Sequence, residues 1–141
     1  MIRYFDTSVL VAALTAEANT AQIQAWLVKQ DQAALAISDW TVTEFSSALS
    51  LKLRSGKISL QERAKALAGF TQLTLNTLRK FSVSPENFHT AAGFADQYEL
   101  GLRSGDAVHL AVCAANSAAI CTLDKHILNA GTILGIPTLL P

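Results

Sequence analysis

The chain is poor in the residues that mark several special classes of protein. Of its 141 residues only two are cysteines, Cys113 and Cys121, and their spacing matches no zinc-binding pattern. We expect both to be small, buried hydrophobic residues in a reducing compartment. No apolar run approaches the roughly 20 residues that a membrane-spanning helix needs. The N-terminus also lacks the basic segment and separate apolar segment of a signal peptide, so we expect a cytoplasmic protein that does not bind membranes.

Net charge is absent as well. Eleven basic and eleven acidic residues cancel, and this balance argues mildly against a dedicated nucleic-acid-binding protein. The only basic concentration is the segment from Lys52 to Lys65, which contains five basic residues and one acid, Glu62. Such a segment can contact a phosphate backbone or form a solvated helix–turn–helix surface, and the sequence leaves both interpretations open.

Hydrophobic residues, in contrast, are abundant. They make up 50% of the chain, and the mean hydropathy is +0.29. Because no segment can span a membrane, this excess, which includes Trp26 and Trp40, indicates a subunit or partner interface. We predict a homodimer and a hydrophobic groove for a partner's helix. The length predicts one domain over residues 1–141.

Strand-like and helix-like segments alternate along the chain. The expected strands are Ile2–Phe5, Leu35–Ile37, Phe81–Val83, Ala119–Leu123 and Thr138–Leu140. The expected helices are Val9–Leu14, a helix capped by Thr20, Thr41–Arg54, Leu60–Leu75, Pro85–Gly101, one following Leu102–Arg103, and Ile127–Asn129. This alternation predicts an α/β fold with a mostly parallel central sheet and helices on both of its faces.

Two of these helices have more specific features. Ser59 and Glu62 form a capping-box pattern, which predicts that a long helix begins there. The helix that opens at Pro85 is expected to direct Phe88, Ala91 and Tyr98, together with Ala95, toward the core.

Four acidic residues lie in otherwise apolar segments. Asp6 and Asp124 each follow a core strand, so both should lie at the same edge of a parallel sheet. Asp106 falls in the first turn of a buried helix, and Glu44 lies next to the inward face of its helix. Asp6 alone could be a simple helix cap. Ionised groups are seldom buried without a partner, and the nearby basic residues are few, so a divalent cation would supply the missing charge.

Four motifs together resemble a known family. Asp6-Thr7-Ser8, Glu44 on the third helix, Arg103-Ser104-Gly105-Asp106-Ala107-Val108-His109-Leu110-Ala111 and Thr122-Leu123-Asp124 are similar to the four acidic motifs of PIN-domain nucleases. The length and the order of the motifs are most similar to VapC-type toxins of type II toxin–antitoxin systems. The resemblance covers essentially the whole chain.

The resemblance implies a metal-dependent endoribonuclease that hydrolyses RNA phosphodiester bonds and leaves a 5′-phosphate and a 3′-hydroxyl. One or two Mg²⁺ or Mn²⁺ ions would be bound, and a cognate VapB-type antitoxin would be the partner. The implied metal ligands and catalytic residues are Asp6, Glu44, Asp106 and Asp124.

Several other residues have implied or alternative roles near these acids. Ser8 and Thr122 would orient a carboxylate or water. Arg103 would touch a substrate phosphate, or instead form a salt bridge with the preceding helix or a contact with the C-terminus of that helix. His109 would be a metal ligand or base, or else a hydrogen-bonded core histidine.

The sequence also fits other functions. The chain could be a PIN nuclease of RNA processing that is not a toxin, or a catalytically silent binding module. A haloacid-dehalogenase-like phosphatase also begins with a strand ending on Asp, but it needs a second Asp where this chain has Ser8. A receiver domain should have an acidic pair near the first strand, and only Lys125 favours that interpretation.

Overall fold

The computed structural model describes all 141 residues and contains one five-stranded sheet. The strands are β1 (Arg3–Phe5), β2 (Leu35–Ser38), β3 (Arg79–Phe81), β4 (Ala119–Cys121) and β5 (Thr138–Leu139). Their order is β3-β2-β1-β4-β5, and every neighbouring pair is parallel. The carboxyl ends of all five strands therefore point to the same edge of the sheet.

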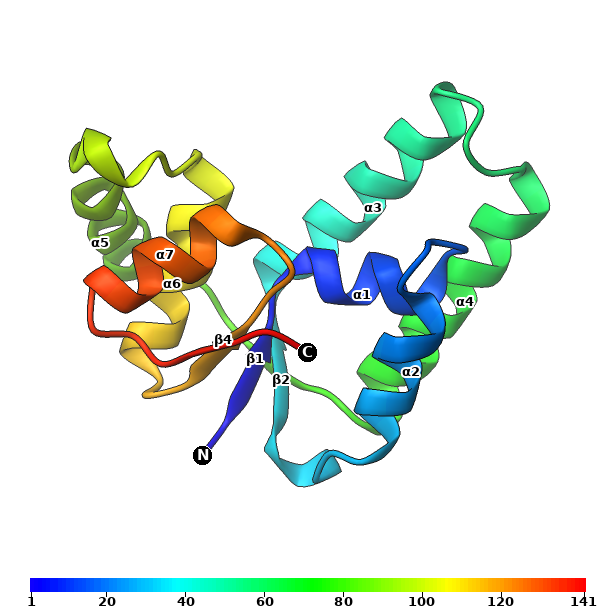
Figure 1. Ribbon diagram of the computed structural model, residues 1–141, viewed down its shortest axis with the longest axis horizontal. Coiled ribbons are helices and arrows are strands. Elements are labelled where there is room, and N and C mark those ends of the chain that lie inside the picture. The colour runs from blue at the N-terminus through cyan, green and yellow to red at the C-terminus, as the bar shows by residue number, and fades with distance from the viewer.

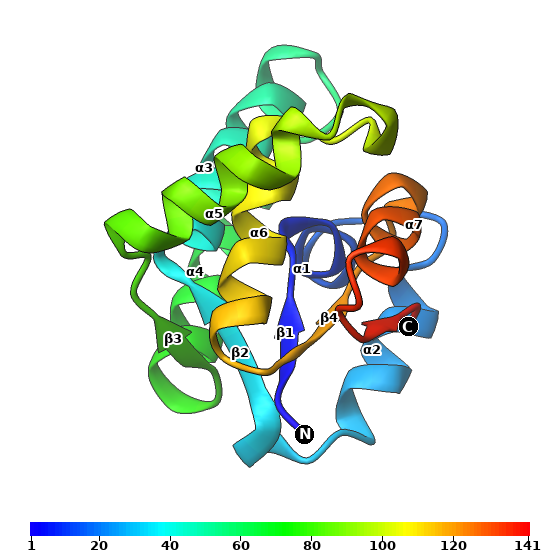
Figure 2. The same ribbon diagram turned by 90° about the vertical axis from the view of Figure 1, so that its left-hand side faces the viewer.

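Seven α-helices cover both faces of this sheet (Figures 1 and 2). They are α1 (Thr7–Leu14), α2 (Thr20–Val28), α3 (Asp39–Arg54), α4 (Leu60–Asn76), α5 (Pro85–Asp96), α6 (Ser104–Ala115) and α7 (Lys125–Ile133). Figure 1 shows α1, α2 and α4 on one side of the strands and α5, α6 and α7 on the other. The predicted α/β class, parallel sheet and two helical layers are confirmed.

Side chains that point alternately to the two faces of the sheet create two hydrophobic cores. Tyr4 packs in the core beneath α6 and α7, whereas its neighbour Phe5 packs in the core beneath α1 and α2. Ile120 and Cys121 divide in the same way. Successive side chains of a strand point to opposite faces, so three residues are enough to serve both layers. The expectation that Cys113 and Cys121 are buried and free is confirmed.

The helix boundaries follow local sequence signals at several points. Ser59 and Glu62 form the predicted capping box, with both of its hydrogen bonds 3.0 Å long. Gly56 ends the turn after α3 with φ of +74°, a conformation that glycine adopts without steric cost. Thr20, however, is the first residue of α2, and Asn19 occupies the cap position. The Thr20 hydroxyl instead donates to the carbonyl oxygens of Ala12 and Thr15.

The inward face of α5 differs from the prediction. Phe88, Ala95 and Tyr98 are exposed, and α5 ends before Tyr98. The helix packs beside α6 (Figure 2), with Ala91 buried in the contact. Apolar residues lie on more than one face of this short helix, so their spacing does not determine which face the neighbouring helix covers.

Other elements also have bounds that differ from the sequence prediction. Strand β3 lies two residues earlier than expected, because its pairing with β2 runs from Arg79 to Phe81. Helix α7 is longer than predicted and extends from Lys125 to Ile133.

The predicted interface residues Trp26 and Trp40 are half-buried and pack against the two cores. Trp26, for example, makes an edge contact with Phe5 at a ring-centroid distance of 5.9 Å. Their part in a subunit or partner interface stays a prediction. Other large apolar side chains are exposed instead, among them Val28, Leu51 and Ile133. None of the helices combines the length and the hydropathy needed to cross a membrane.

Candidate active site

The four acids singled out in the sequence line a single cavity of about 420 Å³. Asp6 directly follows β1, Glu44 lies on α3, Asp106 lies in the first turn of α6, and Asp124 directly precedes α7. Three of these positions lie at the carboxyl edge of the sheet or at the start of a helix, as the parallel topology requires. The remaining residues of the cavity wall are Thr7, Ser8, Ser47, Ala48, Leu51, Arg103, His109 and Ile127.

Asp6 is the most deeply buried of the four acids, with 3% of its surface exposed. Its Oδ1 accepts a hydrogen bond from Ser8 Oγ at 2.6 Å, and its Oδ2 accepts one from Thr122 Oγ1 at 2.5 Å. It also caps α1 through the backbone N–H of Ser8. Burial raises the pKa of the Asp6 carboxyl, and the nearby His109 and these two hydroxyl groups act in the opposite direction.

The predicted contacts of Ser8 and Thr122 with a carboxylate are present. Each hydroxyl donates to Asp6 and also accepts a backbone N–H, from Leu123 in the case of Ser8 and from Asp124 in the case of Thr122. These bonds connect the segment after β1 with the segment after β4. The two strands are neighbours in the sheet, with Phe5 in register with Cys121.

Glu44 is held through one of its two oxygens. Its Oε1 accepts hydrogen bonds from Thr7 Oγ1 at 2.5 Å and from His109 Nε2 at 2.6 Å. Burial by itself raises the pKa of Glu44, but the bonds from His109 and Thr7 outweigh it, and the pKa is lowered. Glu44 is therefore ionised at neutral pH.

Gly105 leaves space for the second oxygen of Glu44. A Cβ atom at this glycine would lie 2.5 Å from Glu44 Oε2 and 3.2 Å from Trp40 Nε1. The Trp40 nitrogen is buried beside this carboxylate and helps to lower the pKa of Glu44. A side chain at position 105 would therefore displace the carboxylate from its place over α6.

Asp106 and Asp124 both cap helices at the cavity. Asp106 Oδ2 accepts the backbone N–H of Arg103 at 3.1 Å, and Asp124 Oδ1 accepts that of His126 at 2.8 Å. The pKa of Asp106 is raised, mainly by burial and further by the negative charges of Asp124 and Glu44. The acids of the cavity therefore repel one another, and a bound cation would relieve this repulsion.

The cavity suits a metal ion that keeps several water ligands better than an ion bound entirely by protein side chains. No group of three or more His, Cys, Asp or Glu side chains is arranged so as to hold an ion by itself. The acids are already engaged with hydroxyl groups, backbone N–H groups or His109. Mg²⁺, however, usually keeps several waters and takes only one or two carboxylates together with substrate phosphates. The all-carboxylate donor set suits this ion or Mn²⁺.

Arg103 and the basic segment occupy different surroundings. Arg103 lines the cavity and takes no part in the ion pairs of Lys52 with Glu17 or of Lys80 with Asp39, so the predicted salt bridge with the preceding helix is not formed. In the segment from Lys52 to Lys65, Lys52 pairs with Glu17 at 2.9 Å. Contact of this segment with RNA stays a prediction.

Two residues of the site were not singled out from the sequence. Thr7 was visible only as the middle residue of the Asp6-Thr7-Ser8 motif, and Gly105 only as the residue before Asp106. The glycine in the first turn of an otherwise apolar helix was the available signal, since glycine disfavours helix and usually marks a close approach.

The chain belongs to the PIN domain family, because the model of that family matches residues 3–132. This match decides against the phosphatase and receiver-domain alternatives. Among curated proteins, none matches the chain.

Several solved structures share the fold. FitAcB from Neisseria gonorrhoeae is 17% identical with a TM-score of 0.75, covering 98% of this chain and 96% of its own. VapC20 from Mycobacterium tuberculosis, a sarcin–ricin loop cleaving toxin, is also 17% identical with a TM-score of 0.75, covering 92% and 95%. VapBC2 from Rickettsia felis, bound to a promoter DNA fragment, is 17% identical with a TM-score of 0.69, covering 100% and 99%.

Proposed function

We propose that the chain is a metal-dependent endoribonuclease and the toxin of a VapBC-type toxin–antitoxin pair, with residues 1–141 as one nuclease domain. The observation that carries this proposal is the gathering of Asp6, Glu44, Asp106 and Asp124 around one cavity in a member of the PIN family. The likeness to a toxin that cleaves the sarcin–ricin loop supports RNA as the substrate.

The residues in and beside the cavity would have different roles in phosphodiester hydrolysis. Asp6 and Asp106 would be the principal ligands of one or two Mg²⁺ or Mn²⁺ ions, with Glu44 and Asp124 completing the site. When bound, such an ion neutralises charge on the phosphodiester and lowers the pKa of water. Ser8 and Thr122 hold the Asp6 carboxylate in one orientation. Arg103, which makes no ion pair, is available to contact a substrate phosphate.

RNA cleavage by the purified protein tests the catalytic part of this proposal. We expect hydrolysis in Mg²⁺ or Mn²⁺, its loss in EDTA, and products with a 5′-phosphate and a 3′-hydroxyl. Asp6→Asn should lose activity by orders of magnitude. Asp31→Asn is the matched control, because Asp31 also caps a turn but is exposed and outside the cavity. A wild-type protein without metal-dependent cleavage would identify a silent binding module instead.

Expression in bacteria separates a toxin from a PIN nuclease of RNA processing. Free expression of the wild-type chain should arrest growth, and co-expression of the cognate antitoxin should restore it. The toxin assignment would be wrong if the wild-type chain and Asp6→Ala were equally harmless while the purified wild-type protein still cleaved RNA.

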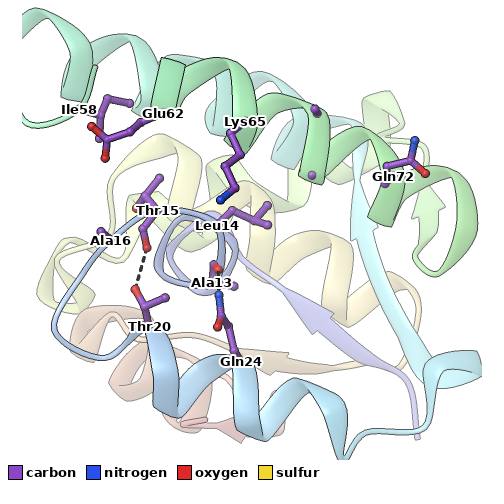
Figure 3. Close-up of a pocket in the computed structure, with 12 residues that line it drawn as sticks. Ala13, Leu14, Thr15, Ala16, Thr20, Gln24, Ile58, Glu62, Lys65 and Gln72 are labelled. Atoms are coloured by element: carbon purple, nitrogen blue, oxygen red, sulfur yellow. Dashed lines mark hydrogen bonds between the residues drawn. The ribbon is translucent and has the colours of Figure 1, made fainter. Parts of the chain in front are cut away.

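A second cavity is the candidate binding site for the antitoxin. It has a volume of about 590 Å³ and lies between α4 and the segment that joins α1 to α2 (Figure 3). Its wall combines apolar atoms of Leu14 and Ile58 with polar groups of Gln24 and Lys65. Toxin–antitoxin complexes with the same fold support a partner of this kind. We propose that an amphipathic helix of the antitoxin binds here.

Substitutions on α4 test this binding site. Ala68 lines the cavity and is exposed, so Ala68→Arg should weaken antitoxin binding without changing RNA cleavage. Thr71→Arg adds the same side chain at an exposed position of α4 outside the cavity, and it should bind the antitoxin normally. Equal affinity of both variants would place the antitoxin elsewhere.

Sedimentation of the free chain at micromolar concentration tests the predicted homodimer, which a stable monomer would contradict.

A further inference from the structure

A buried chain of hydrogen bonds runs from the core to Glu44. The Tyr4 hydroxyl lies 2.7 Å from His109 Nδ1, and His109 Nε2 lies 2.6 Å from Glu44 Oε1. On its other side the Tyr4 hydroxyl lies 2.7 Å from Ser38 Oγ and 3.2 Å from Thr41 Oγ1. Tyr4 is fully buried and His109 is 1% exposed, so water does not compete for these bonds.

These hydrogen bonds connect β1, α3 and α6, the three elements that position Asp6, Glu44 and Asp106. Tyr4 lies on β1, two residues before Asp6, and His109 lies on α6, three residues after Asp106. Glu44 is on α3, one turn after Thr41. Hydrogen bonds between these residues therefore determine where α3 and α6 sit relative to the end of β1.

Chemistry assigns a direction to each hydrogen bond. An ionised Glu44 can only accept, so His109 Nε2 carries a hydrogen and donates. In a neutral imidazole Nδ1 then has a free lone pair, and it accepts the Tyr4 hydroxyl hydrogen. The Tyr4 oxygen in turn accepts from the hydroxyl groups of Ser38 and Thr41. The Tyr4 hydroxyl and both ring nitrogens of His109 are satisfied in this arrangement, and the His109 ring cannot flip without losing two hydrogen bonds.

We propose that Tyr4 and His109 are positioning residues, which hold Glu44 Oε1 and so keep the Glu44 carboxylate in one place in the wall of the cavity. This inference rests on the nuclease function proposed above. Tyr4 does not line the cavity, and both ring nitrogens of His109, which does line it, are engaged by Tyr4 and Glu44. They act by limiting Glu44 to one orientation, as hydrogen-bonding partners of metal-binding carboxylates do in other proteins.

Variants that remove one hydrogen bond at a time test the proposal. Tyr4→Phe deletes the hydroxyl with little change of volume. His109→Leu removes the donor to Glu44, whereas His109→Gln keeps an N–H donor near the place of Nε2. Thr74→Val is the matched control, because it removes a half-buried hydroxyl that donates to the carbonyl of Phe70, outside the cavity. All proteins are compared below their melting temperatures, after circular dichroism has shown that they are folded.

Two readouts distinguish positioning from a purely structural role. For Tyr4→Phe and His109→Leu we expect kcat for RNA cleavage to fall about 10- to 100-fold with KM little changed. The rise in melting temperature on adding Mn²⁺ should also shrink in both. His109→Gln should recover most of the activity and of the Mn²⁺ effect. Thr74→Val should behave as wild type in both assays.

The outcomes separate this proposal from the proposed function. If the wild-type chain neither cleaves RNA nor gains stability from Mn²⁺, the nuclease function fails and the positioning role fails with it. If the wild-type chain does both and Tyr4→Phe matches it, only the positioning role is overturned. The same conclusion follows if His109→Gln is as inactive as His109→Leu, because the donated hydrogen bond would then be irrelevant.

Discussion

Thr122 and Asp6 are joined by a hydrogen bond of 2.5 Å although 116 residues separate them in the chain. The bond exists because β1 and β4 are parallel neighbours, with Phe5 opposite Cys121, so that the residue after each strand lies at the same edge. The carboxylate with the deepest burial in the site is thus held by a hydroxyl from the most distant motif.

Loss of this hydroxyl should destabilise the protein. Thr122→Val leaves one oxygen of the buried Asp6 without its donor, at a cost of about 1–3 kcal/mol in the free energy of unfolding. Urea unfolding at neutral pH measures this change. Thr132→Val is the control, because its exposed hydroxyl bonds only within α7 and to Thr138, and it should cost much less. Equal costs for the two variants would show that the bond to Asp6 has no special weight.

Asp106→Asn should not weaken the metal-free protein. The folded-state pKa of Asp106 is raised, so its ionised form is disfavoured in the fold, and this penalty is present at neutral pH and disappears as pH falls toward the unfolded value. Asparagine keeps an acceptor for the Arg103 N–H and removes the repelling charge. We expect melting in EDTA to show equal or greater stability, by no more than about 1 kcal/mol.

Metal binding should make the wild-type protein more stable than Asp106→Asn. Mg²⁺ binds the folded state, so it should raise the melting temperature of the wild type and raise that of Asp106→Asn less. Cleavage should fall by orders of magnitude in the variant. A variant that is destabilised in EDTA, indifferent to Mg²⁺ and still active would contradict the proposed metal site.

Glu44→Gln should have the opposite effect on the metal-free protein. The folded-state pKa of Glu44 is lowered, so the carboxylate stabilises the fold above its unfolded pKa, and this stability is lost as pH falls through the folded pKa. Replacement loses the charge in two hydrogen bonds, at a cost of about 1–2 kcal/mol at pH 7. The difference from wild type should shrink as the pH falls through the folded pKa of Glu44, which lies below its ordinary value. Denaturant unfolding across this range measures it, and a difference independent of pH would rule out the charge as its cause.

Two glycines on helices provide a matched pair for the site. A Cβ at Gly93 would meet nothing within 4 Å, so Gly93→Ala should stabilise α5 by about 0.5–1 kcal/mol. Gly105→Ala gains the same helix propensity but brings its Cβ against Glu44 Oε2. We expect this variant to lose the gain in stability, and RNA cleavage to fall at least tenfold because Glu44 is displaced. Full activity of Gly105→Ala would show that Glu44 tolerates movement.

Much of the fold was determined by local sequence patterns. The alternation of short apolar runs with periodic segments was sufficient for the α/β class, and the Ser59–Glu62 capping box was sufficient for the start of α4. The positions of Asp6 and Asp124 at one edge also followed from the sequence, because strands of a parallel sheet all end on the same side. In each case the information lies within a few residues of the feature that it specifies.

Only the tertiary structure decided which distant side chains meet. The order β3-β2-β1-β4-β5 places Thr122 on Asp6, and the packing of α6 against α3 places His109 between Tyr4 and Glu44. It also decided that α5 buries Ala91 and exposes Phe88. Periodicity shows that a segment has an apolar face, but it does not contain the identity of the neighbour that covers it. That identity depends on the close packing of the whole chain, in which the absence of a side chain at Gly105 leaves the space that the Glu44 carboxylate occupies.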